Sequence, residues 1–330
     1  MHRATLHHPV QHGIVEDWPK MEQIIHHTFA EFDLDPAETS LVCTEPLFTP
    51  KQNSEQMAEV LFEAFGVPSL ALVSSGMCAL YSSGRTTGVV LDSGAGVTQV
   101  TPVYDSYIIR NAASRFNHGG REVTEHLRTL LFERGLNFAS PQDWLSVRRI
   151  KETLCYVSSL YEKELQEGEE ELHLFSLPDG QEVCVGKEAF RAPEILFSPW
   201  ITMSELPSMS EFVVTAVKGC GIDIRKDLLS SIILSGGNTM FKGFSSRLAG
   251  EVLKEFPGLF GSAKVIAAAD RQYSAWSGAS VLAGLASFAD HLLTRDTFEE
   301  HGPSIVHNYS RSATLGVEGS ENGNAPEEVP

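Results

Sequence analysis

The chain has 330 residues with 25 Lys and Arg against 43 Asp and Glu, so its formal net charge is −18. Hydrophobic residues make up 42% and charged residues 21%, which is typical of a globular protein and excludes a fibrous or wholly disordered chain. The acidic excess disfavours direct binding to nucleic acid or to an anionic membrane surface.

Strand-like and helix-like patterns alternate along the chain, and this alternation predicts an α/β fold. Asn53-Ser54 is expected to cap the second helix, and Gly66 to end it. We predict strands at 41–44, 70–73, 87–92, 97–103 and 231–234, and helices at 18–32, 55–65, 121–134 and 245–255.

Three further segments have distinctive compositions. Residues 273–287 are rich in Ala, Ser and Gly, which predicts helices packed very closely on their neighbours. Residues 162–171 are mostly glutamates and are expected to form an exposed helix end or loop. Residues 308–330 are polar and acidic, so we expect a disordered tail there.

Two glycine turns have the composition of phosphate-binding loops. The first follows a strand that ends at Asp92 and contains Gly94 and Gly96, and the second is Gly236-Gly237 after a later strand. Glycines let backbone amides approach phosphate oxygens closely, and Asp92 could hold a water of a bound Mg²⁺. Alone, the first turn is more typical of an ordinary β-hairpin. Two such turns in one α/β chain favour a nucleotide site between two lobes.

Other candidate sites are weaker. Arg148, Lys151 and Glu152 on one helix could flank a purine and a ribose, although their spacing alone is more typical of a solvated helix face. The N-terminal histidines lack metal-ligand spacing, and no Gly-x-Ser-x-Gly elbow supports a serine hydrolase. The cysteines are irregularly spaced without a Cys-x-x-Cys pair, which indicates reduced thiols in a cytosolic or nuclear protein. No apolar stretch approaches the roughly 18 residues of a membrane span.

Many short strings resemble those of the actin and actin-related protein family, and they follow one another in the family's order over about residues 6–307. Among them are P-V-Q-H-G-I-V (9–15), M-E-Q-I-I-H-H-T-F (21–29), L-Y-S-S-G-R-T-T-G (80–88), I-K-E-T-L-C-Y-V (150–157), D-I-R-K-D-L (223–228) and G-P-S-I-V-H (302–307). The resemblance implies the actin-like ATPase fold, with two RNase H-like α/β lobes around a nucleotide cleft. It places an incomplete first lobe at 1–82 and 274–307, and the second lobe at 83–273 with a smaller subdomain near 119–205.

The resemblance also implies a site for ATP or ADP with a divalent cation. Asp92 would be the cation-side aspartate, acting through water. The nucleotide-binding residues carried over from the family are Asp92, Gly94, Gly96 and Val97 for the phosphates, Arg148, Lys151 and Glu152 for the purine and ribose, and Gly236, Gly237 and Met240 for the opposite wall.

The departures from the family pattern concern catalysis. The family's first phosphate hairpin and most of the first lobe's small subdomain have no counterpart in this sequence. Ala95 stands where the family has a second acidic residue, Ser75 where it has the glutamine that orients water, Gln99 where it has the assisting histidine, and Gln272 where it has the lysine packed on adenine. Phosphoryl transfer is mostly positioning and electrostatics, so we expect weak or absent nucleotide binding and hydrolysis. The missing strands would leave apolar surface that either a partner covers or a longer natural product completes, and we favour the longer product.

These features predict a divergent actin-like cytoskeletal or scaffold subunit that acts through contacts with actin, actin-related proteins or other subunits. We do not expect an enzyme, because the family's ATPase residues are substituted or missing. We expect it in the cytoplasm and cytoskeleton. The alternative is a nuclear actin-related subunit of a chromatin-remodelling or histone-modifying complex. A third reading, an ATP-using enzyme of the same superfold such as a sugar kinase, lacks a recognisable catalytic acid or base.

Overall fold

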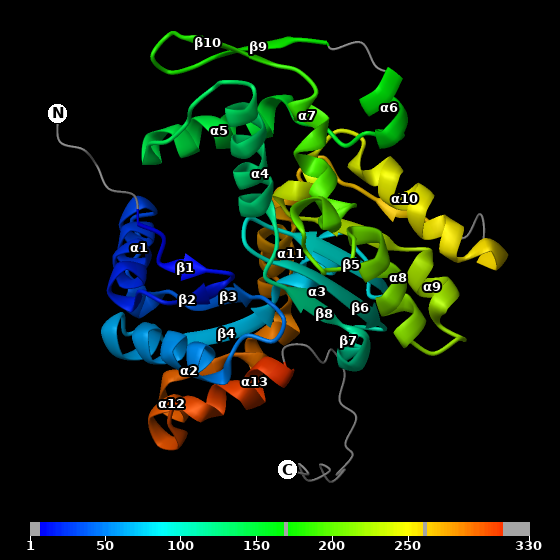
Figure 1. Cartoon of the computed structure of the whole chain (residues 1–330). Coiled ribbons are helices and arrows are strands. Elements are labelled where there is room, and N and C mark those ends of the chain that lie inside the picture. Colours follow the sequence, from blue (N-terminus) through cyan, green and yellow to red (C-terminus); the bar gives the residue numbers. More distant parts are fainter. Residues whose placement is uncertain (1–6, 168–170, 260–262, 313–330) are drawn as a thin grey trace, which may run out of the picture.

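The structure is a computed structural model that describes residues 7–167, 171–259 and 263–312. Two α/β lobes are built on separate sheets, with helices on both sides of each (Figure 1). We name them the smaller-sheet lobe and the larger-sheet lobe. This architecture agrees with the predicted α/β fold class.

The smaller-sheet lobe contains a three-stranded sheet in the order β13-β4-β3. Strand β3 is parallel to β4, and β13 is antiparallel to it. Alternate residues of β4 face opposite sides, so that Leu70 and Leu72 join one apolar cluster while Ala71 and Val73 join another. The elements of this lobe are β1 (Val10–Gln11), β2 (Ile14–Val15), α1 (Trp18–Glu31), β3 (Leu41–Glu45), α2 (Lys51–Glu59), β4 (Ser69–Ser74), β13 (Leu293–Thr294), α12 (Arg295–His301) and α13 (Val306–Ser312).

The larger-sheet lobe contains a six-stranded sheet in the order β12-β11-β5-β6-β7, with β8 also paired to β6. Strand β11 runs parallel to β5, whereas β5 and β6 form an antiparallel hairpin. Its strands are β5 (Gly88–Ser93), β6 (Thr98–Tyr104), β7 (Tyr107–Ile108), β8 (Ser114–Phe116), β11 (Ile232–Ser235) and β12 (Val265–Ile266). The helices packed on one face are α8 (Met209–Gly219), α9 (Arg225–Leu229) and α10 (Phe244–Glu255).

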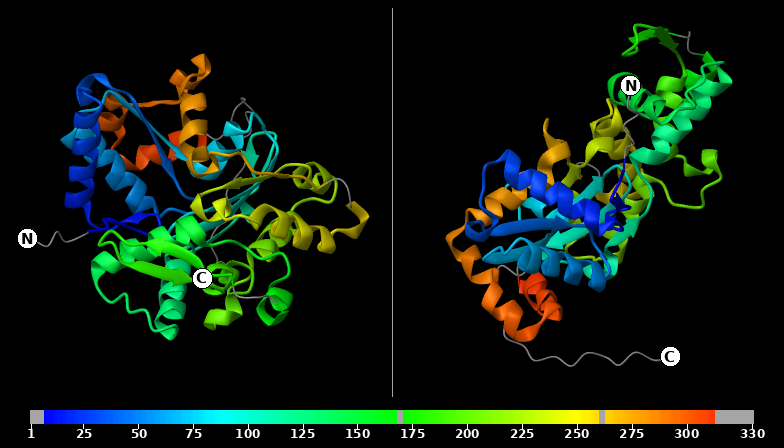
Figure 2. Two further views of the ribbon diagram at one scale, coloured as in Figure 1. Left: turned by 90° about the horizontal axis from the view of Figure 1, so that it is seen from above. Right: turned by 90° about the vertical axis from the view of Figure 1, so that its left-hand side faces the viewer.

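A further group of elements rises from this lobe beyond the end of the sheet, at the top of Figure 1 and of the right-hand view in Figure 2. It ends in a separate two-stranded hairpin. Its elements are α4 (Gly120–Glu133), α5 (Pro141–Leu154), α6 (Tyr161–Glu167), β9 (His173–Ser176), β10 (Glu182–Val185) and α7 (Glu188–Arg191).

Two helices, α3 (Ser75–Ser82) and α11 (Ser274–Ala283), pack closely where the lobes meet. Helix α3 lies between the sheets, since Cys78 packs with the smaller sheet and Met77 with the larger one. A Cβ added to Gly278 of α11 would lie 1.7 Å from the Cys78 carbonyl oxygen. The small residues of this segment therefore allow the close packing that its composition predicts.

Local sequence signals account for several helix ends. Asp17 caps α1 by accepting from the Lys20 amide at 3.2 Å. Gly66 adopts a φ of 71° where the second helical segment ends, as expected for a helix stop.

The predicted cap of the second helix is wrong. Helix α2 begins at Lys51, and Pro50 is its N-cap. The Asn53 side chain instead donates to the Val15 carbonyl at 2.9 Å, and Ser54 donates to Glu45. The side chains of Asn53 and Ser54 are therefore bonded to other parts of the chain and do not cap the helix.

The C-terminal tail prediction is corrected in part. Residues 308–312 belong to helix α13 rather than to a tail. Residues 313–330, the rest of the predicted tail, lie outside the described residues.

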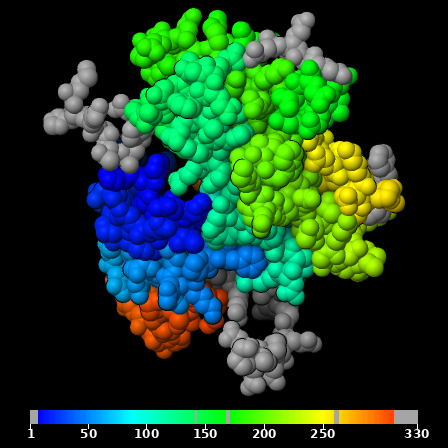
Figure 3. Space-filling view, in the orientation of Figure 1, coloured from blue at the N-terminus to red at the C-terminus, as the bar shows by residue number. Residues whose placement is uncertain are grey.

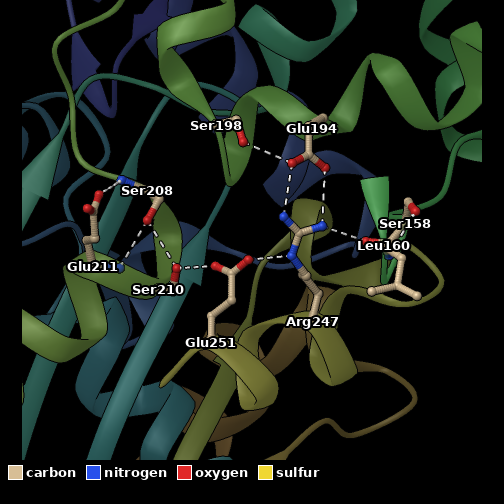
Figure 4. A network of polar contacts seen from close by, with 9 residues as sticks. All are labelled: Ser158, Leu160, Glu194, Ser198, Ser208, Ser210, Glu211, Arg247 and Glu251. Atoms are coloured by element: carbon tan, nitrogen blue, oxygen red, sulfur yellow. Dashed lines mark hydrogen bonds and ion pairs between the residues drawn. The ribbon is translucent and has the colours of Figure 1, made fainter. Parts of the chain in front are cut away.

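A buried ion-pair network joins α10 to the segments around it (Figure 4). Arg247 donates to Glu194 at 3.0 Å and to the Ser158 carbonyl at 2.7 Å, and it also pairs with Glu251. Glu194 is 1% exposed, and burial raises its pKa against the opposing effect of Arg247. A cation at this position is needed because an unpaired buried carboxylate is costly.

Candidate functional site

The first glycine turn closes the β5–β6 hairpin. The Gly94 amide donates to the Val97 carbonyl at 2.8 Å, and Ser93 and Thr98 share a hydroxyl hydrogen bond of 2.8 Å. The amides of Ala95 and Gly96 have no acceptor in the described part of the chain. Consecutive backbone amides of this kind can bind an anion.

This turn is fixed by its neighbours. The Gly94 carbonyl accepts from the Gly120 amide at 3.0 Å and from the Asn238 side chain at 2.9 Å. A Cβ on Gly119 would lie 2.5 Å from the same oxygen, so only glycine fits there. The N-terminus of α4 thus packs directly on the turn.

The second glycine turn lies beside the first. Strands β5 and β11 are parallel and pair Asp92 with Ser235, so both turns leave the same edge of the sheet. Gly236 has a φ of 85°, and its Cβ would lie 2.3 Å from the Ser93 carbonyl. Gly237 by contrast faces open space, and Met240 is 36% exposed. Ligands of α/β sheets bind at this carboxyl edge.

Asp92 is partly buried and already has hydrogen-bond donors. The Gln99 amide nitrogen donates to its Oδ2 at 3.0 Å. Burial raises the pKa of Asp92, although hydrogen bonds from Gln99 and Ser235 oppose the rise. The Gln99 amide thus already occupies one oxygen of this carboxylate.

Ser75 and Gln99 contact each other. The Gln99 amide nitrogen donates to the Ser75 hydroxyl at 2.6 Å, and the Gln99 carbonyl oxygen accepts from the Leu47 amide at 2.8 Å. Both Gln99 N–H groups and its oxygen are therefore bonded within the protein. The structure brings these two residues to the side of Asp92.

The three predicted purine and ribose residues separate on α5. Lys151 is 8% exposed and donates to the Gly120 carbonyl at 2.9 Å, and burial lowers its pKa. Arg148 and Glu152 are exposed and pair with each other at 2.8 Å. Lys151 therefore supports the α4 N-terminus beside the first turn, whereas the other two side chains lie at the surface.

Two further residues, Asn238 and His12, contact the first glycine turn although neither is among the predicted nucleotide-binding residues. Asn238 donates to both Ser93 and Gly94 at 2.9 Å, and it follows Gly236-Gly237 directly, so the second motif already contained it. His12 Nδ1 is 2.8 Å from the Gly96 carbonyl oxygen. No local pattern connects His12 to a turn so distant in sequence.

The residues fit a nucleotide only in part. Free amides in the first turn suit a phosphate, and the open side of Gly237 and Met240 suits a planar group. The surface is notched where the N-terminal residues, in dark blue, face the blue-green α4–α5 region (Figure 3). Within the described ranges, no group of three or more His, Cys, Asp or Glu side chains could hold a metal ion.

A separate cavity of about 1000 Å³ lies beside the C-terminal end of α5. Tyr156, Leu160, Lys163 and Lys242 are among its lining residues, and none of the predicted site residues lines it. Among the helices of the described part, none is both long and apolar enough to cross a membrane.

The family model described as Actin matches residues 1–311 of this chain.

Proposed function

Because this chain belongs to the actin family, we propose that it is a divergent actin-like cytoskeletal or scaffold subunit with weak or absent ATP binding and hydrolysis. It acts through contacts with actin, actin-related proteins or other protein subunits. Its proposed location is the cytoplasm and cytoskeleton.

One observation carries the proposal. Gln99 donates one amide proton to Ser75 and the other to Asp92, and it accepts from the Leu47 amide. A side chain in this state has no proton left to orient an attacking water. Phosphoryl transfer depends on a positioned nucleophile, so we expect this arrangement to disfavour hydrolysis.

The first test measures ATP turnover by the purified chain in the presence of Mg²⁺, with an ordinary actin as the positive control. We expect phosphate release equal to that of a sample without protein. Turnover comparable to that of the actin would overturn the proposal.

Nucleotide binding is tested with a fluorescent ATP analogue, with and without Mg²⁺. Any binding by this chain is expected to be weak and little changed in Asp92→Asn, because the Gln99 amide already occupies Asp92 Oδ2. Tight Mg²⁺-dependent binding that Asp92→Asn abolishes would contradict this.

Assembly is tested by sedimentation of the chain with and without ordinary actin. A scaffold subunit is expected in the pellet only with its partner. Polymerisation of the chain alone on addition of ATP would contradict a role that does not depend on nucleotide. Exclusive nuclear localisation of a tagged chain would replace the cytoskeletal role with the nuclear alternative.

A further inference from the structure

Gln99 connects the two lobes through one side-chain amide. It lies on β6 of the larger-sheet lobe and is 2% exposed. Two of its partners belong to the smaller-sheet side: the Leu47 amide, which follows β3, and the Ser75 hydroxyl at the start of α3. The third partner, Asp92, lies on the neighbouring strand of its own sheet.

The burial of this amide makes its bonds costly to break. Separating the lobes here would break the hydrogen bonds that Gln99 makes to the Leu47 amide and the Ser75 hydroxyl, which are shielded from bulk water in this structure. A hydrogen bond inside such a shielded site is electrostatically stronger than one made in water, and each bond adds a net stabilisation. The contact therefore favours the closed arrangement.

The backbone carbonyl of Leu47 is also hydrogen-bonded to the larger-sheet lobe. Arg115 of β8 donates to the Leu47 carbonyl at 2.9 Å and to the His12 carbonyl at 2.5 Å. Both backbone groups of Leu47 thus bind side chains of the larger-sheet lobe. The next residue, Phe48, has a φ of 55° and is 53% exposed. A bulky residue keeps such a backbone conformation only where its surroundings impose it.

We propose that Gln99 is a clamp that holds the Leu47 segment and the start of α3 against the larger sheet without a bound nucleotide. The clamp needs only hydrogen bonds within the chain, so it does not depend on the proposed scaffold role. Both proposals use the hydrogen bonds of Gln99, but exchange of the Leu47 amide reports the clamp directly, whatever rate of ATP turnover is measured.

Hydrogen exchange of the nucleotide-free protein tests the clamp directly. In the wild-type chain, the Leu47 amide is expected to exchange at least about tenfold more slowly than the Thr49 amide, which has no acceptor in the described structure. Equal exchange at the two positions would overturn the proposal without any variant.

Gln99→Leu removes the three bonds and replaces the amide with an apolar side chain of similar size. We expect exchange of Leu47 to rise about tenfold, with α4 unchanged, and small-angle scattering to give a larger radius of gyration. Gln99→Asn, which keeps the amide but is one methylene shorter, is expected to give the same result and replaces the leucine variant if that one unfolds.

Thr101→Val is the matched control. Thr101 is fully buried on the same strand, two residues from Gln99, and its hydroxyl has no partner in the described part of the chain. Its replacement is expected to leave exchange at Leu47 unchanged. If Thr101→Val raised that exchange as much as Gln99→Leu, the effect would reflect general loosening and the clamp would be refuted.

Discussion

The closest contact between α3 and α11 allows a sharp test of how the lobes are joined. In Gly278→Ala, the added Cβ would lie 1.7 Å from the Cys78 carbonyl oxygen, whereas real Cβ contacts essentially never fall below 3.0 Å. The helices must therefore separate by at least 3.0 − 1.7 = 1.3 Å. Because the obstacle is backbone, no side-chain rotation relieves it.

The expected cost follows from that displacement. Overpacking a buried site costs about 1–3 kcal/mol, and a rigid backbone obstacle favours the upper end. A gap of roughly 1 Å also forfeits a quarter to a half of the dispersion energy of the separated atoms. With an unfolding entropy of about 2.1 cal/mol/K per residue, a loss of about 3 kcal/mol lowers the Tm by about 4 °C for a chain of this length.

Gly250→Ala provides the control. Gly250 lies inside helix α10, and nothing lies within 4 Å of its added Cβ. Alanine is favoured over glycine in a helix by up to about 1 kcal/mol, so this variant should melt at or slightly above the wild-type temperature. Differential scanning calorimetry measures the melting temperatures of wild type, Gly278→Ala and Gly250→Ala. Equal melting of wild type and Gly278→Ala would refute the packing argument.

Three further substitutions test the site and the ion-pair network. Gly236→Ala should destabilise the fold by more than about 2 kcal/mol because it combines a positive φ with a backbone clash, whereas Gly237→Ala should not; equal urea midpoints would contradict this. Asp92→Asn should melt above wild type at pH 7. Burial raises the pKa of Asp92 in the folded state, so the ionised carboxylate opposes folding above that pKa. The difference in melting temperature between Asp92→Asn and wild type should therefore vanish at low pH, where Asp92 is protonated in both the folded and the unfolded chain. A difference that persists at low pH would exclude this cause. Arg247→Met should cost about 3–5 kcal/mol at pH 8 and less as the pH falls, because burial raises the pKa of Glu194 and loss of Arg247 removes the cation that opposes this rise; a loss independent of pH in urea titrations would point to packing alone.

Much of the site's local geometry could be predicted from sequence. Strand ends and glycine turns depend on a few neighbouring residues, so Asp92, the first turn and Gly236 were recognisable from their order along the chain. The small residues around Gly278 likewise indicated close packing of α11. In each case the need for a glycine or another small residue is visible in the local sequence.

The partners of polar side chains were decided by the tertiary structure. Asn53 binds Val15 instead of capping a helix, and Lys151 supports Gly120 from inside the lobe. Local pattern cannot specify these bonds, because each depends on where a distant backbone group arrives after the sheets pack. Sequence alone therefore determined the two glycine turns, while only the folded chain brought them to one sheet edge and placed Gln99 between Leu47, Ser75 and Asp92. The physical reason is that a buried amide must satisfy all its hydrogen bonds, and only the assembled lobes supply the partners.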